Sequence, residues 1–194
     1  MMLIQCLNET ILREPEKGIY YLENGKYKFE TYEHLRTNAL NYLGALQELG
    51  IEEGQEVVFQ TTHNNKFLYL LWACFLGGYI AIPTGFDSIE YIQGTNKVIS
   101  KLKKPVLITE LEKQCENIVL KDKFSLSSLD TKKITGRVTQ NNSKDRIVMV
   151  QFSSGSTGEP KGVIYTDNTL STNMFSILKS TEWKTEERIL TWLT

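Results

Sequence analysis

The feature that most restricts the fold of this chain is an alternation of short apolar runs with longer helical patterns. Residues 56–59 and 79–83 form short runs rich in β-branched and aromatic side chains, as in buried strands. The stretch between them, 67–76, is apolar on nearly every side and is typical of a buried helix. A strand, a helix and a strand of these lengths predict a right-handed βαβ unit with parallel strands. Because further strands are predicted at 105–109 and 147–150, we expect an α/β fold with a mixed or parallel sheet flanked by helices.

Capping and turn residues mark the ends of the elements in the first third of the chain. Apolar residues from Leu3 to Leu12 have helical spacing. Asn24-Gly25 predicts a hairpin turn between strands at 19–22 and 26–29, because both residues tolerate positive φ. Thr31 is expected to cap a helix that ends at Gly50, and Asn64 is expected to cap the apolar helix.

The later elements are predicted with shorter patterns. They are a helix capped by Ser88, a polar helix at 111–119, a short strand at 124–126, a surface loop at 130–145, a short strand at 162–165, a helix capped by Thr166, Asp167 or Asn168, and a strand at 189–193.

The composition excludes several classes of protein. The chain has 194 residues, of which 41% are hydrophobic and 23% charged, so it is long enough for one globular domain with a real core. Its net charge of −1 gives no bias toward nucleic acid or acidic membranes. The longest apolar run, 67–83, is interrupted by Gly77-Gly78 and is too short to span a membrane. With no targeting segment visible, we expect a soluble, cytoplasmic protein without a nucleic-acid partner.

The cysteines and histidines predict no metal site. Cys6, Cys74 and Cys115 are widely spaced, and their odd number suits a reducing compartment. Cys74 lies within the apolar helix, so we interpret it as a core residue and not as a nucleophile.

The chemistry of the chain is concentrated in a Ser/Gly-rich loop that follows the predicted strand at 147–150. The loop contains four hydroxyls, three glycines and one lysine in the order Ser153, Ser154, Gly155, Ser156, Thr157, Gly158, Glu159, Pro160, Lys161, Gly162. Glycine lets the backbone approach a ligand, and successive N–H groups in such a turn form an anion-binding concavity. Hydroxyl donors and a lysine ammonium suit phosphate, so the loop predicts a polyphosphate or pyrophosphate site. The alternative is a solvated Ser/Gly turn without a ligand.

The spacing separates this loop from the common nucleotide-binding motifs. Gly155 and Gly158 are too close for the G-x-x-x-x-G-K-[ST] pattern, and the G-x-G-x-x-G pattern is absent. The order Ser-Ser-Gly-Ser-Thr-Gly-x-Pro-Lys-Gly-Val instead resembles the phosphate loop of the adenylate-forming superfamily. That superfamily includes acyl-CoA synthetases, fatty acyl-AMP ligases and the adenylation domains of non-ribosomal peptide synthetases.

The resemblance extends over nearly the whole chain. Similar pieces are Thr31-Tyr32-Glu33-His34-Leu35, the turn from Gly50 to Val57, the Asn64-Asn65 loop and the stretch from Gly77 to Pro83. Gln55 stands where the family usually has Asp, and Asp167 stands where it usually has His, so the role of that histidine does not carry over.

The resemblance also implies the domain organisation. Residues 1–194 are similar to a single N-terminal subdomain of a larger AMP-binding domain, truncated at its C-terminal end. The adenine and acyl pockets, the acidic Mg²⁺ ligand and the late catalytic lysine are then expected beyond Thr194.

The function implied by the resemblance is ATP-dependent activation of a carboxylic acid. An acyl-AMP forms with release of pyrophosphate, and a thiol of CoA or of a carrier-protein phosphopantetheine then displaces AMP. The resemblance assigns Ser153, Ser154, Gly155, Ser156, Thr157 and Gly158 to the phosphates, and Lys161 to the charge on the leaving pyrophosphate. The stretch from Gly78 to Pro83 and the terminal Thr191-Trp192-Leu193 look slightly more like acyl-AMP ligases and loading domains of polyketide or peptide synthases than like CoA ligases.

Two other functions remain open at this point. In the first, the chain is a non-catalytic subdomain that binds phosphate. In the second, it is a structural α/β subdomain with no ligand at the loop. Because half of the expected site is absent, we expect the chain alone to be inactive.

Overall fold

The computed structural model describes residues 2–85, 89–110, 117–130, 133–154, 159–182 and 184. The strands are β1 (Gly18–Glu23), β2 (Lys26–Thr31), β3 (Glu56–Gln60), β4 (Ile80–Pro83), β5 (Pro105–Thr109), β6 (Lys123–Ser125), β7 (Ile147–Ser154) and β8 (Pro160–Thr166). The helices are α1 (Met2–Arg13), α2 (Tyr32–Glu48), α3 (Asn64–Gly77), α4 (Ile89–Ile99), α5 (Ser127–Asp130) and α6 (Asp167–Thr181).

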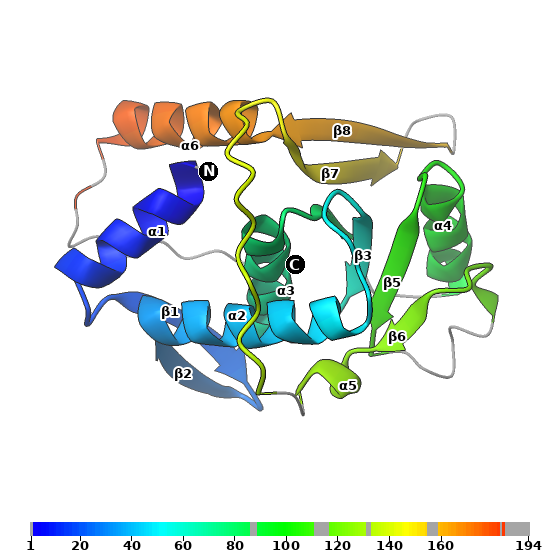
Figure 1. Cartoon of the computed structure of the whole chain (residues 1–194), viewed down its shortest axis with the longest axis horizontal. Coiled ribbons are helices and arrows are strands. Elements are labelled where there is room, and N and C mark those ends of the chain that lie inside the picture. The colour runs from blue at the N-terminus through cyan, green and yellow to red at the C-terminus, as the bar shows by residue number, and fades with distance from the viewer. Residues whose placement is uncertain are drawn as a thin grey trace.

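The centre of the molecule is a six-stranded mixed sheet in the order β6-β5-β3-β4-β7-β8 (Figure 1). Neighbouring strands from β6 to β7 are parallel, and β8 alone is antiparallel to its neighbour, β7. The predicted βαβ unit of β3, α3 and β4 is present with parallel strands. The expectation of a mixed sheet flanked by helices is therefore confirmed.

Helices cover both faces of this sheet, and the side chains of each strand alternate between the two cores. Val57 and Phe59 of β3 pack in the core beneath α2 and α3, whereas Val58 packs in a second core with Val98 and Ile99 of α4. Because successive residues of a strand point to opposite faces, one short strand contributes to both layers. The strands therefore need apolar residues in continuous runs, as the sequence has.

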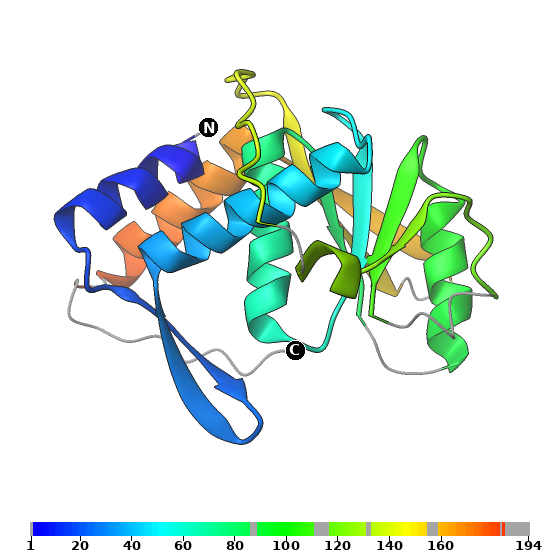
Figure 2. The same cartoon turned by 60° about the horizontal axis from the view of Figure 1, so that its bottom comes forward.

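The N-terminal hairpin is a separate two-stranded sheet that projects from the body of the molecule (Figure 2). Asn24 and Gly25 at its turn have φ of 50° and 74°, which confirms the predicted turn. Cross-strand partners Tyr20 and Phe29 lie on its outer face with their ring centroids 4.8 Å apart.

The two long central helices differ in how they begin. The Thr31 side chain accepts a hydrogen bond from the N–H of His34 at 3.2 Å, so the predicted cap of α2 is confirmed. The prediction that Asn64 caps α3 is wrong by one residue. The His63 carbonyl accepts the first helical bond, from the N–H of Phe67 at 2.9 Å, and this makes His63 the cap and Asn64 the first helical residue.

The segment predicted as a surface loop packs closely against the helices. It has no regular structure from 133 to 143, as predicted, but it follows α5, a short helix that the sequence did not indicate. The N–H of Gly136 donates to the Leu40 carbonyl and that of Thr139 to the Leu76 carbonyl, each at 2.8 Å. The segment crosses α2 and α3 as an extended chain (Figure 1).

Helices from opposite ends of the sequence meet in space, because α1 contacts α6 (Figure 1). Ser88, most of the predicted polar helix (residues 111–116) and the predicted strand at 189–193 lie outside the described residues. Among the helices of the described ranges, none has the length and apolarity that crossing a membrane requires.

Candidate functional site

The Ser/Gly-rich loop is framed by the antiparallel pair of β7 and β8. In the register of this pair, Ser154 lies opposite Pro160 and Ser153 opposite Lys161. The Ser153 hydroxyl donates to the Lys161 carbonyl at 3.5 Å, a long hydrogen bond. The structure therefore brings together Ser153, Ser154 and Lys161, whereas the predicted residues Gly155, Ser156, Thr157 and Gly158 lie outside its described part.

Gly162, the residue after Lys161, fixes how closely the two strands approach. A Cβ atom at Gly162 would lie 3.0 Å from a methyl of Val150 and 3.1 Å from the ring of Phe152. Gly162 therefore shares a face with Val150 and Phe152, which pack against the core under α4. Since neighbouring residues alternate, Lys161 is on the opposite face, with Tyr165.

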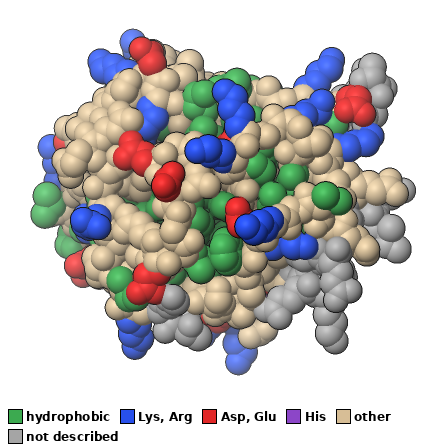
Figure 3. Space-filling view, turned by 45° about the vertical axis from the view of Figure 1, so that its right-hand side comes forward, with side chains coloured by type: hydrophobic (Ala, Val, Ile, Leu, Met, Phe, Trp, Pro, Cys, Tyr) green, Lys and Arg blue, Asp and Glu red, His purple; other side chains and the backbone are tan. Residues whose placement is uncertain are grey.

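A cluster of charges lies where the loop leads into β8. The two carboxylate oxygens of Glu159 contact the ammonium groups of Lys97 and Lys101, each at 3.5 Å. Figure 3, which turns the α4 side of the molecule forward, shows basic side chains on either side of an acidic one at its upper right. Together with Lys161, three lysines lie close to the loop.

Asp167 is part of the fold and does not face an open site. Its side chain is only 4% exposed and accepts a hydrogen bond from the Ser171 hydroxyl at 3.1 Å. Its N–H donates to the Arg146 carbonyl at 2.9 Å. Burial lowers the pKa of Arg146, while Asp167 and Glu53 act in the opposite direction. Of the three predicted caps for α6, the structure selects Thr166, whose side chain forms a reciprocal capping box with Thr169.

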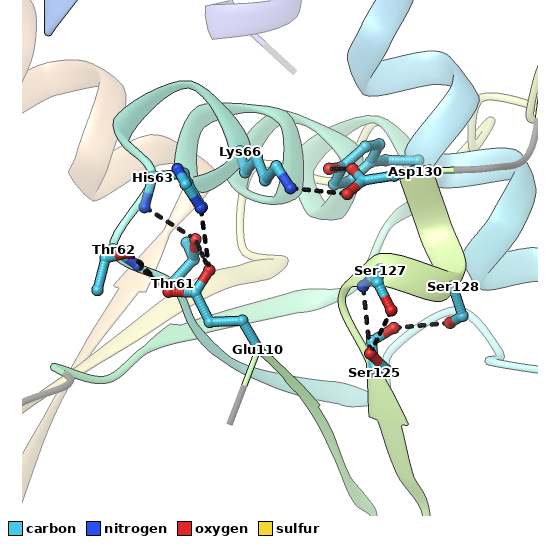
Figure 4. Close-up of polar contacts among 10 residues, drawn as sticks. Thr61, Thr62, His63, Lys66, Glu110, Ser125, Ser127, Ser128 and Asp130 are labelled. Atoms are coloured by element: carbon cyan, nitrogen blue, oxygen red, sulfur yellow. Dashed lines mark hydrogen bonds and ion pairs between the residues drawn. The ribbon is translucent and has the colours of Figure 1, made fainter. Parts of the chain in front are cut away.

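A second polar cluster, which the sequence analysis missed, lies between the ends of β3 and β5 (Figure 4). The Glu110 carboxylate accepts hydrogen bonds from the Thr61 hydroxyl at 3.0 Å, from the Thr62 N–H at 2.8 Å and from the Thr62 hydroxyl at 2.7 Å. The ring of His63 is 3.7 Å from the same carboxylate. The available signal was that polar residues follow directly after two strands that turned out to be neighbours.

This second cluster occupies the topological switch point of the sheet. The chain passes from β3 through α3 to β4 on one side, and then returns through α4 to β5 on the other side of β3. Although burial by itself raises the pKa of Glu110, the bonds from Thr62 and Thr61 and the nearby His63 lower that pKa overall. Its acceptor positions are thus occupied by the protein itself, and the cluster joins the β3–α3 loop to β5.

A third group in Figure 4 attaches α5 to the helices. The Asp130 carboxylate accepts a hydrogen bond from the Tyr42 hydroxyl and contacts the Lys66 ammonium at 2.7 Å. Burial, reinforced by Asp130, raises the pKa of Tyr42, which keeps its hydroxyl protonated as a donor. These contacts hold α5 against α2 and α3.

The cysteines agree with the interpretation made from sequence. Cys74 is fully buried, and burial raises its pKa, so it is a core residue. Cys6 is a free thiol, and Cys115 lies outside the described residues. Within the described ranges, no three His, Cys, Asp or Glu side chains come close enough to hold a metal ion. The hydroxyl of Ser153 and the ammonium group of Lys161 suit phosphate oxygens.

Comparison with known proteins places this geometry in a family. The AMP-binding enzyme family matches residues 7–194. Curated relatives include a mitochondrial malonate–CoA ligase from Xenopus laevis, 24% identical over 192 residues that cover 87% of this chain and 31% of the relative. A medium-chain fatty-acid–CoA ligase from Escherichia coli strain K12 is 28% identical over 187 residues, which cover 84% of this chain and 32% of that ligase. The chain thus spans about a third of the length of these relatives.

Solved structures give the same result for the fold. A structure of McyG A-PCP complexed with phenylalanyl-adenylate superposes with a TM-score of 0.83 at 26% identity, over 95% of this chain and 31% of that one. The fatty acid AMP ligase from Legionella pneumophila superposes with a TM-score of 0.85 at 21% identity, over 98% of this chain and 35% of the ligase. With its family match over nearly the full sequence, its α/β sheet and its Ser/Gly loop between β7 and β8, the chain belongs to the AMP-binding enzyme family.

Proposed function

We propose that this chain is the phosphate-holding part of an enzyme that activates a carboxylic acid with ATP. A carboxylate oxygen bonds to the α-phosphorus, the bond from that phosphorus to the bridging oxygen breaks, and pyrophosphate leaves. A thiol sulfur then attacks the acyl carbon of the acyl-AMP, the thiol proton passes to a base or to water, and AMP leaves.

One observation carries this proposal: β7 and β8 hold Ser153 opposite Lys161 at the two ends of a hydroxyl- and glycine-rich loop. Phosphoryl transfer depends mainly on positioning and on charge stabilisation. We assign Ser153, Ser154, Ser156, Thr157 and the amides of Gly155 and Gly158 to the β- and γ-phosphates. Lys161 is assigned to the negative charge that develops on the leaving pyrophosphate.

Replacing Lys161 tests the assignment in the intact enzyme. A charge-assisted hydrogen bond contributes roughly 1.5–3 kcal/mol, so Lys161→Ala is expected to slow adenylation by roughly one to two orders of magnitude. The measurement is ATP–pyrophosphate exchange, with Lys28→Ala as the control, because Lys28 is on the N-terminal hairpin and forms an exposed ion pair with Glu23 at 4.0 Å. An exchange rate in Lys161→Ala equal to that of the wild type would rule out this role.

The proposal includes the partners that the reaction needs. These are a carboxylic acid, ATP with Mg²⁺, and as acceptor either CoA or the phosphopantetheine of an acyl or peptidyl carrier protein. We leave the acceptor open because the similar proteins include a CoA ligase as well as a structure with a carrier domain. We favour an acyl-AMP ligase or a loading domain of a polyketide or peptide synthase, in keeping with the stretch from Gly78 to Pro83. Free thiols at Cys6 and Cys74 support a reducing, cytoplasmic setting.

We further propose that residues 1–194 are an N-terminal subdomain and that the remaining parts of the site belong to sequence beyond it. Relatives about three times as long support this division. The purified 194-residue chain is therefore expected to form no acyl-AMP from ATP and a carboxylic acid. Mass-spectrometric detection of an acyl-AMP, against a Lys161→Ala control, would contradict this expectation.

The alternative is a non-catalytic subdomain, which either binds phosphate at the loop or has only a structural role. A phosphate-binding module and a structural one are separated by a thermal-shift titration of the chain with pyrophosphate. Stabilisation that Lys161→Ala abolishes indicates phosphate binding at the loop. No stabilisation at millimolar pyrophosphate indicates a structural role.

A further inference from the structure

Two lysines at the end of α4 lie beside the phosphate loop without belonging to its motif. Lys97 is in the last turn of α4, and Lys101 lies two residues beyond the end of that helix. Both contact Glu159, which directly follows residues 155–158 in the chain. Each ammonium group takes a different carboxylate oxygen of Glu159, at 3.5 Å in both cases.

The described ends of the hairpin keep these ammonium groups near the loop. Glu159 directly precedes Pro160, which lies opposite Ser154, so the groups that contact its carboxylate lie beside the end of the β7–β8 pair. Lys161 is on the sheet face of Tyr165, and Lys97 and Lys101 come from the face that α4 covers. The end of the hairpin therefore has cations on both sides.

The contact between Glu159 and the lysines is one that a phosphate can replace. The side chains are 59% exposed for Glu159, 48% for Lys97 and 41% for Lys101, and ion pairs at such exposure are weak. A pyrophosphate group carries more negative charge than one carboxylate and offers more acceptor oxygens to the two ammonium groups. The carboxylate of Glu159 thus lies between two cations in weak, exposed contacts.

We propose that Lys97 and Lys101 form a second cationic contact for polyphosphate at the β7–β8 hairpin, and that Glu159 holds their ammonium groups until the polyphosphate displaces its carboxylate. This inference rests on the proposed phosphate-binding function of the loop. It adds Lys97 and Lys101 as phosphate-binding residues outside the Ser/Gly motif, and it makes Glu159 a competitor of the phosphate for their ammonium groups.

The competition makes the two kinds of substitution act in opposite directions. The double variant Lys97→Gln/Lys101→Gln loses the cations, so its affinity for pyrophosphate is expected to fall roughly tenfold. Glu159→Gln removes the competing carboxylate from both lysines, so its affinity is expected to rise roughly threefold to tenfold. If Glu159 only anchored the loop to α4, both variants would instead weaken binding.

The test is a calorimetric titration of the 194-residue chain with pyrophosphate at low ionic strength. Lys28→Gln, on the N-terminal hairpin, is the matched control and is expected to bind like the wild type, and circular dichroism melting verifies that each variant is folded. Opposite effects of the two variants support the proposal. Two outcomes overturn the proposal and leave the function of the loop intact. In one, both variants weaken pyrophosphate binding equally. In the other, the double variant binds pyrophosphate like the wild type while Lys161→Gln binds it more weakly. A wild-type chain that does not bind pyrophosphate overturns the loop function and this inference together.

Discussion

Two acidic residues of this chain lie where a functional site could be expected, but their side chains bond to other residues of the protein. Asp167 follows shortly after the phosphate-loop motif, and it is buried at the start of α6 with Ser171 and next to Arg146. Glu110 is at a topological switch point, where α/β proteins commonly bind ligands, but Thr61 and Thr62 fill its acceptor positions. Sequence position alone indicates neither outcome, because both depend on which strands become neighbours.

Glu110 makes the stability of the chain sensitive to acid. Since the pKa of its carboxyl is lowered in the folded protein, the ionised form contributes stability that is complete above the ordinary glutamate pKa. That contribution is lost as the pH falls through the lower pKa of the folded state. Glu110→Gln is therefore expected to be less stable than the wild type at neutral pH, and the difference is expected to shrink below the ordinary glutamate pKa. Urea unfolding across this pH range measures it, and a constant difference at every pH would contradict the assignment.

At the scale of elements, glycines decide how closely the segments pack. A Cβ on Gly44 in α2 would lie 1.9 Å from the Ile134 carbonyl oxygen, so the crossing segment approaches the helix only because this residue has no side chain. At Gly94 in α4, in contrast, a Cβ would meet no heavy atom of the described residues within 4 Å, apart from its neighbours in the helix. Two glycines in helix interiors thus have different reasons to be there.

The same substitution is expected to act with opposite sign at these two positions. Gly44→Ala forces the crossing segment away from α2 and is expected to destabilise the chain by roughly 1–3 kcal/mol. Gly94→Ala adds helix propensity without a clash and is expected to stabilise it by roughly 0.5–1 kcal/mol. Chemical denaturation of both variants measures the pair. A stable Gly44→Ala variant would show that the segment is not held against α2.

Much of the element order follows from local sequence signals. Neighbouring residues predict the hairpin at Asn24-Gly25, the cap at Thr31 and the alternation of strands with helices. The structure confirms all three. The packing of the segment after α5 and the union of Glu110 with Thr61 depend on contacts between distant parts of the chain, so periodicity could not predict them. The residues of the phosphate site were predicted from the Ser/Gly motif. Among them, Ser153, Ser154 and Lys161 can be compared with the structure.

At the scale of the whole molecule, the surface over α6 and β8 is unusually apolar. Met174, Phe175, Ile177 and Leu178 of α6 are each more than 40% exposed, as are Val163 and Ile164 of β8. Phe175 also lines a shallow groove with Met2 of α1. Single apolar side chains are common on protein surfaces, whereas these residues lie together on two neighbouring elements and form a patch.

Polar substitutions on α6 test how much of this surface is exposed to water. The double variant Ile177→Gln/Leu178→Gln is expected to bind less of a hydrophobic dye, while its melting temperature changes by only a few degrees. Leu70→Gln is the contrasting control, because Leu70 is fully buried in α3 and its replacement is expected to unfold much of the chain. A large loss of stability in the α6 variant would show that its face is covered.

The contact between α1 and α6 also sets the order of events during synthesis. Leu3 and Leu7 are buried in the folded chain. Helix α1 contacts both α2, which begins at Tyr32, and α6, which begins only at Asp167. At a translation rate of about 5–20 residues per second, the first helix leaves the ribosome roughly 10–30 s before this partner. The part of α1 that packs on α6 therefore stays uncovered until residues 167–181 have been made, whereas its contact with α2 can form much earlier.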